Sequence, residues 1–200
     1  MRIYFTRHGE SEANLLREHS NRGLKHPLTA KGREQAAALA QKLADIPVTR
    51  LFTSPIMRAV QTAEILSDAL GVSYEITDAL REYDCGILEG QADEAAWQLH
   101  FAVFDAWVQR KNWDRRIEGG ESFIEIRDRF VPFIEGLVAE YGQSVANIVL
   151  VGHGGLYRCM LSLVLANADF DFVLNQPMGN TACIVAETGP ESLTWIKWEG

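Results

Sequence analysis

The run Asn147–Val151 (NIVLV) constrains the fold more than any other stretch, because its apolar residues fall on both faces of an extended chain. A strand buried on both faces is typical of the centre of a parallel sheet. Met1–Thr6 is a second run of this kind. The pattern continues with strand-like runs at 50–54 and 72–76 and helical spacing over about 30–44 and 55–70. This alternation predicts an α/β fold.

Single residues mark where the predicted helices begin and end. Thr29 is expected to cap the first long helix, Pro55 to occupy the first position of the next, and Gly71 to close it. The C-terminal part offers two further strands, 181–187 and 192–198, which Gly189-Pro190 separates and which we expect to be antiparallel.

These patterns together predict a single domain over residues 1–200. We expect a three-layer αβα fold with a mostly parallel central sheet of about six strands, an antiparallel C-terminal edge and a helical cap. The cap is an insert over about 91–118, where aromatic residues recur at helical spacing over 92–111.

Charge and composition narrow the classes of partner. The net charge of −8 disfavours nucleic acid and anionic membranes, and no apolar run is long enough to span a bilayer. Without a signal-peptide pattern, we expect a cytoplasmic location. The three cysteines, Cys85, Cys159 and Cys183, are too widely spaced to suggest a disulfide framework or a CxxC metal site. The sequence is compatible with a homodimer and does not decide the oligomeric state.

Two of the predicted strands end in the same unusual way. Met1–Thr6 is followed by Arg7-His8-Gly9, and Asn147–Val151 is followed by Gly152-His153-Gly154-Gly155. Ligands bind outside the carboxyl ends of parallel strands, so we expect both imidazoles at one edge of the sheet, near helix N-termini that favour negative charge. His8 is therefore a candidate nucleophile or base.

A metal site and a phosphate site compete for this edge. Glu10, Glu12 and Glu82 could join the two histidines as zinc ligands. Arg7, however, places a permanent positive charge beside His8, where a cation would have to lie, and guanidinium binds phosphate oxygens in bidentate fashion. The residues favour a phosphate site and no metal.

Four motifs in chain order resemble the histidine phosphatase superfamily, which includes the phosphoglycerate mutases. They are Arg7-His8-Gly9-Glu10-Ser11 with Asn14, the segment 54–63 (SPIMRAVQTA), the segment 80–90 around Glu82, and Gly152-His153-Gly154-Gly155. The segments 27–32 (PLTAKG) and 119–122 (GGES) also resemble the phosphatase branch. The likeness extends over essentially the whole chain.

The resemblance implies that His8 is phosphorylated on a ring nitrogen and then hydrolysed, while a backbone carbonyl near the motif holds the other nitrogen. An imidazole is about three-quarters neutral at pH 7, so it needs no separate base. The resemblance also implies that Arg7, Arg58 and His153 form the phosphate pocket and that Asn14 is a further phosphate ligand. Ser11 and Gly154, within the matched motifs, are expected at the substrate.

Glu82 matches the general acid of the family, which protonates the leaving alcohol and then activates water. This role needs a raised pKa, which burial and the nearby phosphate would supply. Asp84 and Glu89 are close in sequence and remain alternatives.

The expected activity is hydrolysis of a small phosphate monoester, without metal or cofactor. Arg17, Arg22, Lys25 and the aromatic helix are expected to set specificity at the mouth of the cleft. Two alternatives stay open: a phosphoglycerate mutase, for which Arg115-Arg116 would bind substrate carboxylates, and a catalytically weak phosphoryl-binding regulatory protein.

Overall fold

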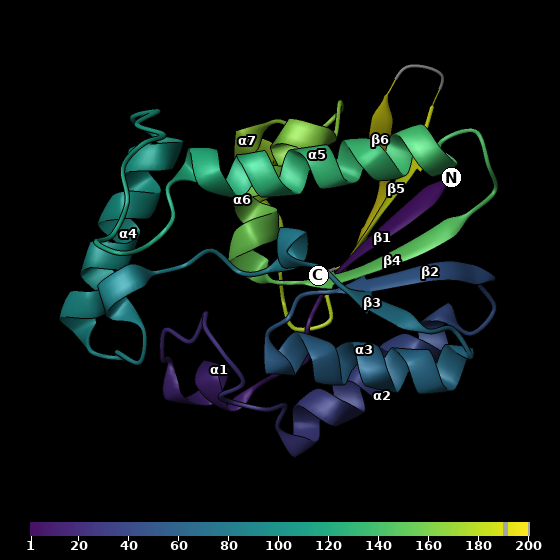
Figure 1. Ribbon diagram of the computed structural model, residues 1–200, viewed down its shortest axis with the longest axis horizontal. Helices are drawn as coiled ribbons and strands as arrows, with labels where there is room; N and C mark the ends of the chain where they lie inside the picture. Colours follow the sequence, from purple (N-terminus) through teal and green to yellow (C-terminus); the bar gives the residue numbers. More distant parts are fainter. Residues whose placement is uncertain (190–191, 200) are drawn as a thin grey trace.

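The computed structural model describes residues 1–189 and 192–199, and the C-terminal half of the predicted turn at Gly189-Pro190 lies outside the described residues. A six-stranded sheet in the order β3-β2-β4-β1-β5-β6 forms its centre (Figure 1). The strands are β1 (Arg2–Arg7), β2 (Val48–Thr53), β3 (Tyr74–Ile76), β4 (Asn147–Gly152), β5 (Cys183–Thr188) and β6 (Leu193–Glu199).

The strand directions confirm the predicted fold class. β4 pairs in parallel with β1 and β2, and β2 pairs in parallel with β3. β5 and β6 form the predicted antiparallel edge. β4 is buried from Ile148 to Gly152, as a strand covered on both faces must be.

Helices cover both faces of the sheet and give the three layers (Figure 1). Because successive side chains of a strand point to opposite faces, Tyr4 packs with the helices on one face while Ile3 and Phe5 pack on the other. The first face is covered by α2 (Ala30–Leu43) and α3 (Met57–Leu70), and the second by α5 (Phe123–Tyr141) and α6 (Gly154–Val164).

Helix ends follow the predicted capping residues in two of three cases. The Thr29 hydroxyl accepts from Gly32 N at 2.9 Å, and Gly71 ends α3 with φ of 67°, a left-handed conformation that suits glycine. The prediction for Pro55 is wrong, because α3 begins at Met57 with Ile56 as its cap. The Ser54 hydroxyl accepts from Ile56 N at 3.2 Å, and this turn delays the start of the helix.

The remaining elements are helices and turns that lie outside the sheet, and one of them belongs to the predicted cap. The predicted insert is helical only in its first part, where Asp93 caps α4 (Glu94–Val108). The sequence patterns missed α7 (Phe170–Asn175) and the 3-10 turns η1 (Asp78–Leu80) and η2 (Gly86–Leu88). The short helix α1 (Glu12–Leu16) follows β1. Among the helices of the described residues, none combines the length and apolarity needed to cross a membrane.

Candidate active site

The candidate site lies where three neighbouring parallel strands end. Arg7 at the end of β1 is in register with Gly152 at the end of β4, and Thr53 of β2 is in register with Val151. His8 N donates to Gly152 O at 3.1 Å. This register brings the residues that follow the three strands to one edge of the sheet, although they are distant in sequence.

The backbone fixes which nitrogen of His8 is available. Its Nδ1 lies 2.6 Å from Gly9 O, a contact in which Nδ1–H must donate because a carbonyl can only accept. Nε2 therefore carries the lone pair, and it accepts from Arg58 Nε at 3.0 Å. Burial, followed by the charges of Arg58 and Arg7, holds the pKa of His8 well below 6.5. The imidazole is neutral at pH 7 and can act as a nucleophile.

Two guanidinium groups belong to the site of His8: that of Arg58 is buried, and that of Arg7 is partly buried. Arg58 extends from the first turn of α3, and its second hydrogen bond goes to Ser20 O at 2.7 Å. Arg7 donates from Nη1 to Met178 O at 2.8 Å, while its buried Nε has no partner in the described part of the chain. Burial lowers the pKa of Arg58 to about 10 and also lowers that of Arg7. Both remain cationic at pH 7, so the site attracts an anion.

His153 caps α6 directly after β4 and packs against His8, with ring centroids 5.1 Å apart. Its Nε2 lies 2.7 Å from the Ser54 hydroxyl, which orients the ring. Its buried Nδ1 has no partner within the described ranges 1–189 and 192–199. Burial, together with the charge of Arg58, keeps the pKa of His153 well below 6.5, so this ring is also neutral.

Glu82 reaches the same site from the loop after η1. Its carboxylate accepts from Gly155 N at 2.9 Å and from Leu156 N at 2.6 Å, at the N-terminus of α6. Burial raises its pKa, while Arg58 and these amides oppose the rise. A carboxyl with a raised pKa, close to a nucleophile, can donate and later accept a proton.

A pocket of about 220 Å³ opens over these side chains. It is lined by six residues that the sequence predicted for the site: Arg7, His8, Asn14, Arg58, Glu82 and Gly154. Asn14 Oδ1 accepts from Ser11 N at 3.0 Å and from Asn180 Nδ2 at 3.3 Å, so its own amide group is available to a ligand. His153 is fully buried and is not a lining residue.

Three predicted substrate residues do not reach this pocket. Ser11 is fully buried and caps α1, because its hydroxyl bonds Asn14 Oδ1 at 3.2 Å. Arg22 is held away by Asp84 Oδ2 at 2.8 Å and by Gly119 O at 2.9 Å. Lys25 is exposed on the loop and is not a lining residue.

The alternative acids also lie outside the pocket. The second oxygen of Asp84 accepts from Gly86 N at 2.7 Å, and Glu89 accepts from Asn21 N at 2.8 Å. Both carboxylates stabilise loops. The rival zinc ligand Glu10 binds Thr29 and Lys31, outside the pocket.

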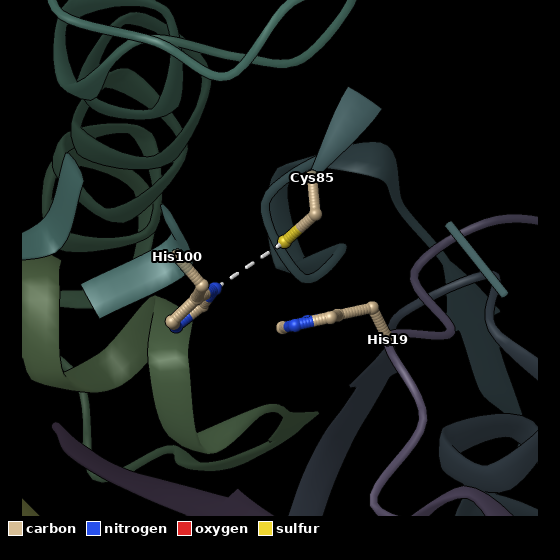
Figure 2. Close-up of side chains that lie close together, drawn as sticks. All are labelled: His19, Cys85 and His100. Atoms are coloured by element: carbon tan, nitrogen blue, oxygen red, sulfur yellow. Dashed lines mark hydrogen bonds between the residues drawn. The ribbon is translucent and has the colours of Figure 1, made fainter. Parts of the chain in front are cut away.

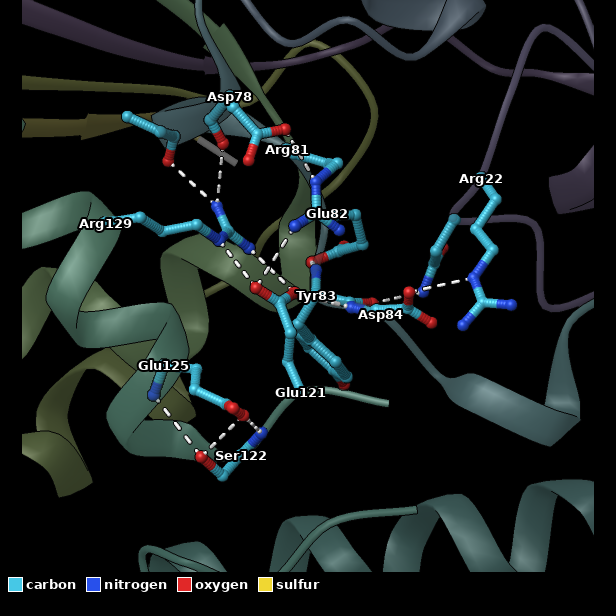
Figure 3. Close-up of polar contacts among 12 residues, drawn as sticks. Arg22, Asp78, Arg81, Glu82, Tyr83, Asp84, Glu121, Ser122, Glu125 and Arg129 are labelled. Carbon is cyan, nitrogen blue, oxygen red and sulfur yellow. Dashed lines mark hydrogen bonds and ion pairs between the residues drawn. The ribbon is translucent and has the colours of Figure 1, made fainter. Parts of the chain in front are cut away.

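A charged network holds the loop that carries Glu82 (Figure 3). Glu121 is its centre: it accepts two hydrogen bonds from Arg129, at 2.9 and 3.2 Å, and one from Asp84 N at 2.8 Å. Arg81 also donates to it at 3.2 Å. Glu121 of the GGES segment therefore contacts residues on both sides of Glu82, the side chain of Arg81 and the backbone of Asp84. Sequence reasoning identified this motif but not this role.

Sequence reasoning also missed much of the pocket wall. Its further lining residues are Ala13, Glu18, His19, Ser20, Asn21, Tyr83, Trp97, His100 and Gly155. Trp97 belongs to the aromatic helix that was expected near the cleft, and Gly155 to a quoted motif. The segment Glu18–Asn21 carries no motif. Only the fold indicates its place, through the hydrogen bond from Arg58 to Ser20 O.

Comparisons with known proteins agree with this geometry. The family model of the histidine phosphatase superfamily (branch 1) matches residues 3–199. A probable phosphoglycerate mutase GpmB of Salmonella choleraesuis is 30% identical over 171 residues, which cover 82% of this chain and 75% of that protein.

Among solved structures, a mycobacterial glucosyl-3-phosphoglycerate phosphatase in complex with VO3 is similar to this chain, with a TM-score of 0.79 and 26% sequence identity. The match covers 100% of this chain and 97% of the mycobacterial chain. A putative alpha-ribazole-5'-P phosphatase from Escherichia coli has a TM-score of 0.81 over 100% and 97% of the two chains; its 24% identity indicates a shared fold alone. The match over nearly the full length, with His8, both arginines and Glu82 around one pocket and His153 packed against His8, shows that the chain belongs to the histidine phosphatase superfamily.

Proposed function

We propose that the protein is a phosphomonoesterase that hydrolyses a small phosphorylated metabolite through a phosphohistidine on Nε2 of His8. The observation that carries this proposal is the state of the His8 ring. Gly9 O binds Nδ1–H, so Nε2 carries the lone pair, and the donor that contacts this lone pair is the cationic Arg58. Glu82 lines the same pocket.

In the first step, Nε2 of His8 attacks the phosphorus atom and the bond from phosphorus to the ester oxygen breaks. Glu82 gives its proton to that oxygen, and the alcohol leaves. Arg7 and Arg58 bind the equatorial oxygens and offset their charge, which is most of what catalysis of phosphoryl transfer requires. Asn14 can donate a further hydrogen bond from its amide group.

In the second step, the Glu82 carboxylate takes a proton from water, and the hydroxide formed attacks the phosphohistidine. The bond between Nε2 and phosphorus breaks, and inorganic phosphate and neutral His8 are restored. His153 stays neutral beside His8, and the Ser54 hydroxyl keeps its ring in place. His8, Glu82 and the groups that bind the phosphoryl oxygens therefore suffice for both steps.

The rest of the pocket supports hydrolysis of a monoester with an uncharged alcohol over phosphoglycerate mutase activity. Its lining residues beyond Arg7 and Arg58 include the rings of His19, Trp97 and His100, and among residues 1–189 and 192–199 no other arginine or lysine lines it. Arg116 instead pairs with Glu125 at 2.9 Å, outside this pocket. A carboxylate on the substrate would thus lack a second cationic site.

The direct test is hydrolysis of p-nitrophenyl phosphate and a panel of phosphorylated metabolites by purified protein in EDTA, beside His8→Ala. We expect phosphate release by the wild type and none by the variant. Full activity of His8→Ala, or activity only with added metal, would overturn the mechanism. Exchange of 3-phosphoglycerate with 2-phosphoglycerate without phosphate release would identify a mutase instead.

One variant tests the assignment of Glu82 as the general acid, and two matched variants are its controls. Glu82→Gln should lower the turnover number by about 10²–10⁴-fold, the usual contribution of general acid–base catalysis. Asp84→Asn and Glu89→Gln remove the neighbouring carboxylates that contact loops outside the pocket, and each should keep most of the wild-type rate. If one of these two were as inactive as Glu82→Gln while still folded, the acid would be misassigned.

A further inference from the structure

Three metal-binding side chains meet in the wall of the pocket, although they come from distant segments. His19 lies on the loop after α1, Cys85 precedes η2, and His100 lies in the middle of α4 (Figure 2). One donor atom from each lies within 4.8 Å of the other two. The mechanism proposed above uses none of the three.

The surroundings of His100 orient one nitrogen toward the cysteine. Its Nε2 lies 3.1 Å from the Tyr83 hydroxyl, and its Nδ1 lies 3.8 Å from Cys85 Sγ. When Nε2–H donates to Tyr83, Nδ1 presents its lone pair to the space beside the sulfur. Metal-binding histidines are commonly fixed in this way by a hydrogen bond from their second nitrogen.

His19 contributes a polar atom that has no other partner. The residue is 4% exposed and packs against Trp97, with ring centroids 4.1 Å apart and the ring planes tilted by 36°. Its Nε2 is buried and forms no hydrogen bond within the described part of the chain. Burying a polar atom without a partner costs free energy, so a ligand for this nitrogen would be stabilising.

Cys85 is fully buried as a thiol, and Asn21 Nδ2 donates to its sulfur at 3.1 Å. A metal replaces the thiol proton, which leaves to solvent, and the hydrogen bond from Asn21 stabilises the resulting thiolate.

We propose that His19, Cys85 and His100 bind a thiophilic divalent cation of the Zn²⁺ class, and that its binding inhibits the phosphatase. Two nitrogens and one sulfur match the preference of zinc, with water as a fourth ligand. Zinc bonds of about 2.0–2.3 Å require ligand atoms about 3.3–3.8 Å apart. Cys85 Sγ and His100 Nδ1, at 3.8 Å, already have this spacing, so the closure needed is chiefly that of the His19 ring toward the other two, by about 1 Å. Because His19 and His100 line the catalytic pocket, this closure narrows it.

The inhibitory part rests on the proposed phosphatase function, whereas metal binding does not. The experiment therefore measures binding without activity first. Co²⁺ is added in stoichiometric steps to EDTA-stripped, desalted protein, and the absorption spectrum is recorded. One equivalent should produce the near-ultraviolet thiolate-to-cobalt charge-transfer band and the visible bands of a tetrahedral ion, and Zn²⁺ should displace it.

Cys85→Ser tests the site, and Cys183→Ser is the control because it also removes a buried thiol. The first should lose the charge-transfer band and bind Co²⁺ about 100-fold more weakly or worse, since loss of an outer-shell partner alone costs about 10–100-fold. The second should keep the wild-type spectrum. Circular dichroism checks that both variants fold. No band in the wild type, or the same band in Cys85→Ser, would overturn the site.

Turnover of p-nitrophenyl phosphate is then measured against Zn²⁺ concentration. The wild type and Cys183→Ser should lose most of their activity over the range in which Zn²⁺ displaces Co²⁺, and Cys85→Ser should retain it. A Co²⁺ spectrum without inhibition would overturn the regulatory part alone. Absence of turnover before any metal is added would count against the proposed function and leave the spectroscopic result standing.

Discussion

Arg58 is 5% exposed and contacts His8, and replacing it with Met tests the electrostatic account of the site. Burial lowers its pKa from 12.5 to about 10. At about 1.4 kcal/mol per pKa unit, the buried charge destabilises the free protein by about 3 kcal/mol. Methionine removes this cost but leaves His8 Nε2 and Ser20 O without their donor, which costs about 1–3 kcal/mol for each of the two groups. The two effects offset each other, so the free energy of unfolding should decrease by no more than about 3 kcal/mol.

The effect of Arg58→Met on catalysis should be larger than its effect on stability. A cation about 4 Å from a phosphoryl charge contributes about 4 kcal/mol at an effective dielectric constant of about 20. Losing it corresponds to a decrease of about 10³-fold in kcat/KM. Arg33→Met, a change at an exposed position of α2, is the matched control and should keep the wild-type value.

The assay combines p-nitrophenyl phosphate kinetics with thermal unfolding in the presence and absence of inorganic phosphate. Phosphate should raise the Tm of the wild type and of Arg33→Met, because a ligand that binds only the native state stabilises it, and should not raise that of Arg58→Met. If the kcat/KM of Arg58→Met fell by less than about fivefold, the effect would be far smaller than expected for a close charge, and the electrostatic argument would be refuted. A phosphate-dependent Tm shift that survives in Arg58→Met would refute it as well.

Three further outcomes follow from the same site. The rate should decrease toward high pH, as Glu82 loses its proton, and toward low pH, as His8 gains one. A pH profile of kcat/KM should show both decreases, and the decrease at high pH should be absent in Glu82→Gln. His8 and His153 are buried with lowered pKa values, so below about pH 6.5 the unfolded chain binds more protons. As the pH falls through this range, the free energy of unfolding should decrease by up to about 1.4 kcal/mol per pH unit for each histidine. Urea titrations at a series of pH values should show a weaker dependence of this free energy on pH for His153→Gln than for the wild type. An equal dependence would contradict a neutral His153 in the folded state. Gly155→Ala would place a Cβ 2.8 Å from Glu82 Oε1 and should lower kcat more than it changes KM, whereas Gly136→Ala, which has open space, should retain wild-type kinetics.

Local sequence was sufficient for most of the fold. The apolar run of β4 required burial on both faces, and it is the central strand. Thr29 caps the start of α2 and Gly71 the end of α3, as expected, because capping depends on atoms within a few residues. The predicted helix start at Pro55 was wrong, because the backbone there follows the turn at Ser54, whose hydroxyl also contacts the distant His153.

The sequence by itself identified most of the candidate site residues. His8 and His153 follow apolar strands, and the carboxyl ends of parallel strands meet at one edge of the sheet. Tertiary structure alone decided the remaining assignments. It placed Glu82 in the pocket and turned Asp84 and Glu89 toward loops, and it brought His19 against Trp97. The physical reason is that strand burial is encoded by neighbouring residues, whereas the direction of a loop side chain depends on partners tens of residues away.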